Sequence, residues 1–278
     1  VFGLTFNNRR INKKIYIKRR AKKLLLPYFF TATFLYIPVR YIIGYYQEDS
    51  RGYIITYFQD VILGYDINYL WYLVMLFEVT SFVVLFSKFF LSNNLRIRFY
   101  VLFLCIILST TRYILPFDRY IFQIDRSMEF LLWFYIGILL EENRYRISSL
   151  RGKKIYILLV ASAVIWLCSF FLHSHLEIGL NKALYSGAAL YSVKIIKAGI
   201  RLIMEGSAVL FFFMIFNHML PICKGILKLI EKKSFDIYLY HVPIIMLYKY
   251  LILKLPIYDG MSNFMYLGLC LLDVFLSF

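Results

Sequence analysis

The chain has 278 residues, of which 61% are hydrophobic, 20% aromatic and only 17% charged. A soluble domain of this length needs roughly a quarter of charged residues to cover its surface, so the composition excludes a soluble fold and indicates an integral membrane protein. The formal net charge of +16 comes from short basic clusters between apolar runs rather than from one basic face, which argues against a nucleic-acid-binding protein.

Eight apolar segments have, or approach, the roughly 20 residues that a helix needs to cross the hydrocarbon core. Backbone polar groups must be paired inside lipid, so each segment is predicted to be a helix. The expected fold is therefore an all-α, polytopic membrane helix bundle with eight transmembrane helices, forming a single domain over residues 1–278. The predicted spans are 24–46, 70–87, 99–117, 128–140, 155–172, 195–220, 234–253 and 262–278.

Basic residues alternate between the segments that join these spans. Segments 1–23, 88–98, 141–154 and 221–233 hold 21 lysines and arginines, whereas the intervening loops 47–69, 112–127, 173–194 and 254–261 hold seven. By the positive-inside rule the first set is cytoplasmic. Both ends of the chain are therefore predicted to lie in the cytoplasm.

The first span is preceded by a basic cluster in "IKRRAKKLLLPYFF", at the predicted inner surface. One interpretation is a topology signal that also attracts anionic lipid head groups. The other is a binding site for phosphate groups, because arginine presents a two-pronged donor to phosphate oxygens. The cluster consists of Arg19, Arg20, Lys22 and Lys23.

The next stretch of chain carries two further features. "RGYIITYFQDVILGY", in the first outer loop, is amphipathic enough to form a short re-entrant or interfacial segment. Glu78 is the only charged residue of the span 70–87. A lone acid in the bilayer either pairs with a base on another helix or serves function. Both possibilities stay open for Glu78.

Four charged residues mark the start of the span 195–220. Spacings of 3, 4 and 4 place them on one helix face that enters from the outer surface. This face could line a water-filled cleft, or it could consist of two lysines that reach the interface and one structural ion pair. Arg201 and Glu205 can pair at i,i+4. The four residues are Lys194, Lys197, Arg201 and Glu205.

The span 234–253 begins with "SFDIYLYHVPI", in which Ser234, Tyr238 and His241 share one helical stripe. Pro243 has no N–H, so it should leave the carbonyl of Leu239 without its helical donor and kink the helix. The stripe could face an internal cavity in which His241 exchanges a proton, or His241 could be a packing residue bonded to a neighbouring helix. If function is the reason, the ionisable side chains of both stripes should converge on one polar chamber.

Two of these stretches together resemble the integral-membrane "acyltransferase three" family, the O-acetyltransferases of bacterial cell-surface sugars. "KRRAKKLLLPYFF" is similar to the family's basic motif before a Pro-Tyr pair, although the usual R-x-x-R reads here as Arg20-x-x-Lys23 or Arg19-x-x-Lys22. "LWYL" at 70–73 and "WFYIGILLEE" at 133–142 are weaker similarities. The family signature S-[YF]-x-[IL]-Y-L-x-H-x-P is met by Ser234, Phe235, Ile237, Tyr238, Leu239, His241 and Pro243.

The resemblance implies an enzyme of the bacterial inner (plasma) membrane. It would move an acetyl group from cytoplasmic acetyl-CoA, held by Arg19, Arg20, Lys22 and Lys23, to a hydroxyl of a cell-surface or lipid-linked saccharide. Family members have ten helices, and the first carries the catalytic histidine. That helix is expected upstream of Val1, so we expect the chain as given to be inactive alone, with His241 in an auxiliary role. The expected cavity-lining residues are Ser234, Tyr238, Arg201, Glu205 and Glu78.

The alternative functions are a polysaccharide transporter or flippase, and a polysaccharide polymerase. Neither requires a basic Pro-Tyr motif together with the histidine segment. No bound metal is expected, because His173 and His175 have only Glu177 as a nearby acid.

Overall fold

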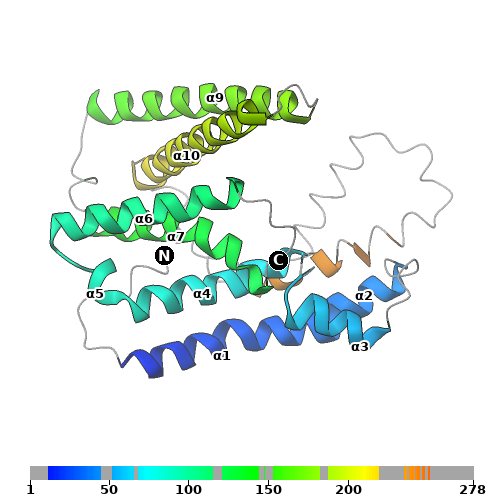
Figure 1. Ribbon diagram of the computed structural model, residues 1–278. Coiled ribbons are helices and arrows are strands. Elements are labelled where there is room, and N and C mark those ends of the chain that lie inside the picture. Colours follow the sequence, from blue (N-terminus) through cyan, green and yellow to red (C-terminus); the bar gives the residue numbers. More distant parts are fainter. Residues whose placement is uncertain are drawn as a thin grey trace. The chain divides into compact units, whose positions relative to one another are not determined.

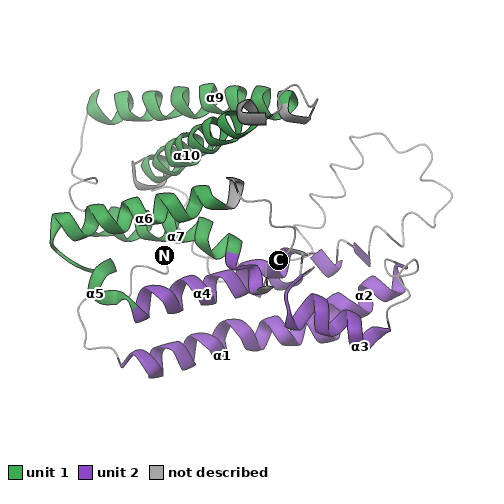
Figure 2. Cartoon of the chain, viewed as in Figure 1, with its two compact units in different colours: residues 1–10, 86–118, 125–224 green, residues 11–85, 119–124, 225–278 purple. Residues whose placement is uncertain are grey.

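The computed structural model describes residues 12–44, 52–65, 68–114, 121–143, 147, 153–181 and 187–218, together with part of 235–250. Every regular element in these residues is helical, as predicted for an all-α fold. The chain forms two compact units, coloured separately in Figure 2. We call them the α1–α4 unit (11–85, 119–124 and 225–278) and the α5–α10 unit (1–10, 86–118 and 125–224).

The α1–α4 unit is built around one long helical segment. α1 begins at Lys13, eleven residues before the predicted span, because the side chain of Asn12 caps it by accepting a hydrogen bond from the Ile15 N–H (3.3 Å). The basic cluster therefore lies inside α1 and not in front of a helix. The elements are α1 Lys13–Thr31, a π-helical turn Ala32–Tyr36, α2 Ile37–Ile42, α3 Tyr53–Thr56, a second π-helical turn Tyr57–Ile62, and α4 Trp71–Leu85, with 3-10 turns at Asn68–Leu70 and Ile121–Gln123.

α1 and α4 pack against each other and supply most of the buried core of this unit (Figure 1). The start of α1 meets the end of α4, since Lys13 Nζ donates to the backbone oxygen of Leu85 (2.8 Å). That oxygen belongs to the last turn of α4, where carbonyls have no helical donor. The two helices are thus antiparallel, and residues 13 and 85 lie at the same end of the helix pair, as the charge pattern predicts.

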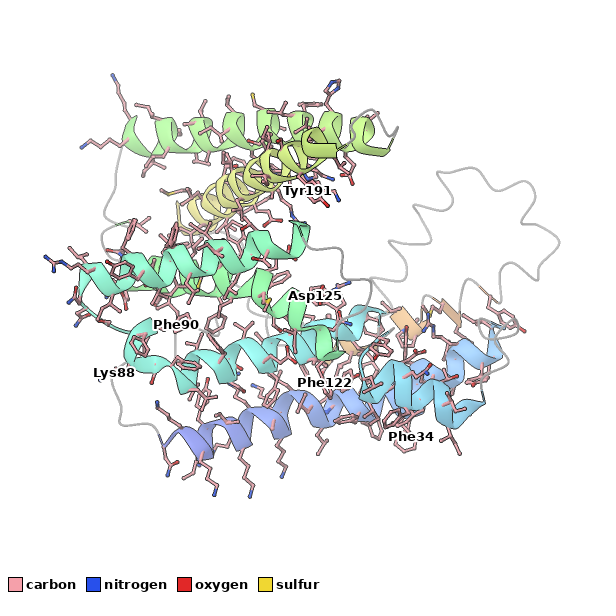
Figure 3. All side chains as sticks on the ribbon, in the orientation of Figure 1. Phe34, Lys88, Phe90, Phe122, Asp125 and Tyr191 are labelled. Atoms are coloured by element: carbon pink, nitrogen blue, oxygen red, sulfur yellow. The ribbon has the colours of Figure 1, made fainter. Side chains whose placement is uncertain are left out.

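The amphipathic stretch of the first outer loop, expected to be a short re-entrant or interfacial segment, forms a short helix, Tyr53–Ile62. It packs against α1 and the π-helical turn that follows through two hydroxyl contacts: Tyr28 Oη donates to the backbone oxygen of Val61 (2.7 Å), and Tyr57 Oη lies 2.9 Å from Thr33 Oγ1. Its other face is apolar and open, with Ile54 81% exposed. Phe34, on the neighbouring π-helical turn, is also exposed (Figure 3).

The α5–α10 unit contains the longest helices. α9 and α10 pack along each other, and α10 also contacts α6 (Figure 1). Phe90 meets the buried Tyr135 edge-on, with ring centroids 5.5 Å apart, and so joins α5 to α7. The elements are α5 Ser87–Phe90, α6 Leu95–Ile114, α7 Ile124–Glu142, α9 Lys153–Asn181 and α10 Gly187–His218.

Six of the eight predicted spans coincide with helices, but the count of eight is not confirmed. In the part of the chain that the structure describes, three helices are long and apolar enough to cross a bilayer, and Trp71–Leu85 is apolar but shorter. The predicted span 262–278 lies outside the described residues. The three long helices are Lys13–Ile42, Lys153–Gly179 and Leu190–Ile215.

The predicted outer loop 173–194 was too long. α9 continues to Asn181 and α10 starts at Gly187, so helix replaces most of that loop. The sequence "HSHLEIGLN" contains no proline to stop α9, and His173 and Glu177 pair at i,i+4 along it. Helices can extend past the hydrocarbon, and here the extension carries charged side chains.

Candidate functional site

The basic cluster of α1 presents cations on an accessible helix surface. Arg19, Lys22 and Lys23 are exposed, and Arg20 is half-buried. Arg20 is held in place by Tyr16: its Nε donates to the Tyr16 hydroxyl (2.9 Å), and its guanidinium lies 5.3 Å from the centre of that ring. The cluster thus combines one oriented guanidinium with exposed neighbouring charges.

The Pro-Tyr pair that follows the cluster anchors α1 inside the unit. α1 continues through Pro27, and Tyr28 is only 2% exposed. The Tyr28 hydroxyl bonds to the backbone of Val61, as described above. The turns of α1 that follow the basic cluster are therefore held in place by the helix Tyr53–Ile62.

The histidine segment, residues 234–244, is joined to the start of α4 by two reciprocal hydrogen bonds. Tyr69 Oη donates to the backbone oxygen of Leu239 (2.8 Å), and Tyr238 Oη donates to the backbone oxygen of Tyr69. Leu239 O is the carbonyl that Pro243 cannot serve, so the Tyr69 hydroxyl replaces the missing helical donor. Burial raises the pKa of Tyr69, which keeps the hydroxyl a neutral donor. Tyr72 adds a ring contact to Tyr238, with centroids 5.5 Å apart.

These contacts bring "LWYL", at residues 70–73, next to the histidine segment. The two stretches lie far apart in the sequence, and both resemble motifs of the same family. The aromatic cluster continues to α1, because Tyr36 packs edge-on against Tyr69 at 6.0 Å. Sequence reasoning missed two charged residues of this interior: Arg40, 2% exposed with its guanidinium 4.8 Å from the Tyr36 ring centre, and Asp60, 3% exposed. The available signal for Arg40 was a lone base within an apolar run, "FLYIPVRYIIG".

The α5–α10 unit holds a second polar site, which we call the Arg201 cluster: Glu129, Arg201 and Glu205. The predicted i,i+4 pair is present, with Arg201 Nε 2.6 Å from Glu205 Oε1. Arg201 Nη2 also donates to Glu129 Oε1, so one guanidinium bridges carboxylates from α7 and α10. The Glu129 side chain is only 4% exposed. It was missed because it stands at the edge of the predicted span 128–140. Asp125 lies one turn before it, near the start of α7 (Figure 3).

The outer part of the α10 stripe has other partners. Lys197 Nζ lies 3.2 Å from Glu177 Oε1 of α9, and His173 Nδ1 lies 3.8 Å from Glu177 Oε2. Lys194 Nζ lies 5.9 Å from the ring centre of Tyr191, which Figure 3 shows on α10. Among the described residues, no group of histidine, cysteine and acidic side chains could hold a metal ion.

The remaining predicted site residues are placed only in part. Glu78 is half-buried in α4. Ser234 and His241 lie outside the described residues. Tyr238 belongs to the α1–α4 unit, whereas Arg201 and Glu205 belong to the α5–α10 unit. The convergence of the two stripes on one chamber therefore stays a prediction.

A comparison with protein families agrees with the motifs. The family model described as "Acyltransferase domain" matches residues 1–278, the full length of the chain. No curated protein and no solved structure matches the chain. The basic Pro-Tyr segment, the histidine segment and the apolar helices all lie within the matched residues. The chain belongs to the acyltransferase three family of membrane acyltransferases.

Proposed function

We propose that the chain belongs to an O-acyltransferase that takes an acetyl group from cytoplasmic acetyl-CoA and delivers it to a hydroxyl of a cell-surface or lipid-linked saccharide. Family membership supports acyl transfer at a membrane. The observation that carries the choice of donor is the basic, accessible surface of α1, directly before the anchored Pro-Tyr pair.

The donor site follows from charge. Coenzyme A carries several phosphate charges, so it cannot enter lipid and needs a cationic dock at the membrane surface. α1 contains no acidic residue, and its exposed cations stand directly before the buried part of the helix, which begins at Leu24. Arginine binds phosphate oxygens through two donors and lysine acts as a point charge. Arg20, oriented by Tyr16, is the best-positioned phosphate ligand of the cluster.

The chemical step needs a base for the acceptor. The base removes the hydroxyl proton, the oxygen attacks the thioester carbonyl, and the C–S bond breaks to release the thiolate, which then takes up a proton. Histidine suits this task because its pKa lies near neutral pH. By the family resemblance, the principal base is another histidine, and His241 is an auxiliary proton carrier.

The donor site is tested by removing two cations from the cluster. In the intact protein, Arg20→Gln together with Lys23→Gln should raise KM for acetyl-CoA about tenfold, because charge-assisted contacts to phosphate are lost. The matched control is Lys14→Gln with Lys18→Gln, which removes the same charge from the same helix, where both lysines are exposed. An unchanged KM in the first variant, or an equal rise in both, would return the cluster to the role of a topology signal.

Coenzyme A binding also separates the proposal from the two alternatives. A thermal unfolding scan of the purified protein should show stabilisation by millimolar-range coenzyme A, since a ligand that binds only the folded state raises its stability. A flippase or a polymerase has no reason to respond. The absence of any shift in Tm would favour those classes.

A further inference from the structure

The side chain of Trp133, on α7, reaches the backbone of α10 beside the Arg201 cluster. A Cβ atom added at Gly206 would lie 3.7 Å from Cη2 of Trp133, so the edge of the indole ring lies against the backbone of α10. Trp133 follows Glu129 by one helical turn, and Gly206 directly follows Glu205. A half-buried indole ring and a charged cluster are therefore neighbours where side chains of α7 reach α10.

The two carboxylates of the cluster differ in accessibility. Glu129 is 4% exposed, whereas the Glu205 side chain is 24% exposed. Glu205 Oε1 accepts the bond from Arg201, and within the described residues Oε2 has no hydrogen-bond partner. An ionised carboxylate is an acceptor only. Glu205 thus offers an oriented acceptor atom on a partly open surface in the middle of an apolar helix, where a charge is costly to maintain.

The charge of the cluster restricts what can bind there. The partly exposed Glu205 carboxylate disfavours phosphate or carboxylate groups beside it, because like charges repel at short distance. A neutral hydroxyl can donate its proton to Oε2, and the flat indole can pack against the apolar side of a sugar ring. This combination suits a neutral saccharide better than an anionic ligand.

A row of charged side chains leads along α10 to the cluster. Lys194, Lys197, Arg201 and Glu205 are all half-buried and follow one face of the helix. Lys194 and Glu205 are separated by roughly 16 Å along the axis. By the charge pattern, the Lys194 end is the outer one. An acceptor from the outer side would meet the cluster after following this face.

We infer that Glu205 and Trp133 form a binding subsite for a neutral sugar hydroxyl of the acceptor, in which Arg201 and Glu129 position the Glu205 carboxylate. The inference rests on the proposed function, since it assigns the acceptor side of that reaction. Glu205 binds the saccharide acceptor, and Arg201 and Glu129 are positioning residues.

The test is Glu205→Gln in the intact protein, reconstituted in lipid. The donor is radiolabelled acetyl-CoA, and the acceptor is the envelope glycan fraction of the native cells after mild base has removed its O-acetyl groups. The substitution keeps the shape and the Arg201–Glu129 pair but replaces the acceptor-only carboxylate. We expect KM for the glycan to rise about tenfold while KM for acetyl-CoA stays within about twofold. Trp133→Leu should also raise KM for the glycan.

The matched control is Glu142→Gln, which removes a glutamate that also pairs with an arginine of this unit (Arg98 Nη2 to Glu142 Oε2, 2.9 Å). It should leave KM for the glycan unchanged. Should Glu205→Gln fail to fold, Glu205→Asp keeps the charge while withdrawing the carboxylate by one methylene, and the same rise in KM is expected.

The outcomes separate the two proposals. A fall in kcat alone, or an unchanged KM for the glycan, would overturn the subsite and leave acetyl transfer intact. Stabilisation by coenzyme A without any transfer to the glycan would overturn the subsite together with the saccharide acceptor. A wild-type protein that does not respond to coenzyme A would refute the proposed donor instead.

Discussion

The two units pair their buried polar groups in different ways. Each must bury polar groups among apolar helices, where an unpaired group is expensive. In the α1–α4 unit, which also buries the charged Arg40 and Asp60, neutral tyrosine hydroxyls satisfy backbone carbonyls, as Tyr69 does for Leu239. In the α5–α10 unit, charged groups satisfy each other, as Arg201 does for Glu129 and Glu205.

The difference has consequences for tolerance. A neutral hydrogen bond is worth little net, and its loss leaves one carbonyl without a donor. A buried ion pair depends on both partners, because removal of one leaves a charge in a poorly solvated place. The family motifs, the basic Pro-Tyr segment and the histidine segment, lie in the α1–α4 unit. The Arg201 cluster consists of ion pairs, so its stability should be more sensitive to the loss of one partner.

The largest effect should come from breaking the Arg201 cluster. Arg201→Met removes the guanidinium that bridges both carboxylates, and we expect the free energy of unfolding to fall by about 3 kcal/mol, the lower end for a broken buried pair, because Arg201 itself is 28% exposed. The measurement is denaturant unfolding of the purified protein in detergent micelles, followed by circular dichroism.

A second substitution distinguishes charge from packing. Arg201→Met combined with Glu129→Gln removes the buried carboxylate as well, so most of the lost stability should return. If the double variant were as unstable as the single one, the cost would arise from packing of the arginine stem and not from an uncompensated charge.

A smaller effect is expected in the α1–α4 unit. Tyr69→Phe deletes the hydroxyl that replaces the donor missing at Pro243, and it should cost about 1–2 kcal/mol by the same assay. In a Pro243→Ala background the new backbone N–H can bond to Leu239 O, so there Tyr69→Phe should cost less than about 0.5 kcal/mol. Equal costs in both backgrounds would show that the ring contacts of Tyr69, and not its hydroxyl, hold the histidine segment.

Local chemistry made several features predictable from the sequence. Spacing was sufficient for the Arg201–Glu205 pair, because i,i+4 neighbours meet on any helix. The chemistry of proline was sufficient for the freed carbonyl of Leu239. Amphipathic patterning singled out the segment that forms the short helix Tyr53–Ile62, although it did not specify that the segment is helical.

Other features depend on tertiary contacts that no local pattern encodes. That Tyr69 supplies the missing donor, or that Glu129 is the second partner of Arg201, follows from which helices pack together. Helix ends were also missed: apolarity predicts where a helix enters lipid, whereas Asn12 determines where α1 begins.

The smallest effect should come from a pair on the same helix as the Arg201 cluster. Lys197 Nζ lies 3.2 Å from Glu177, much as Arg201 contacts Glu129, but the Glu177 side chain is 49% exposed whereas that of Glu129 is 4% exposed. An exposed pair is worth about 0–1 kcal/mol, so Lys197→Gln should change the free energy of unfolding by less than about 1 kcal/mol. High salt screens exposed charges more than buried ones. The effect of Lys197→Gln should therefore vanish at about 1 M sodium chloride, while most of the effect of Arg201→Met persists. If both effects vanished, water and ions would reach Glu129 as freely as they reach Glu177, and the comparison between a charged interior and a solvated helix face would fail.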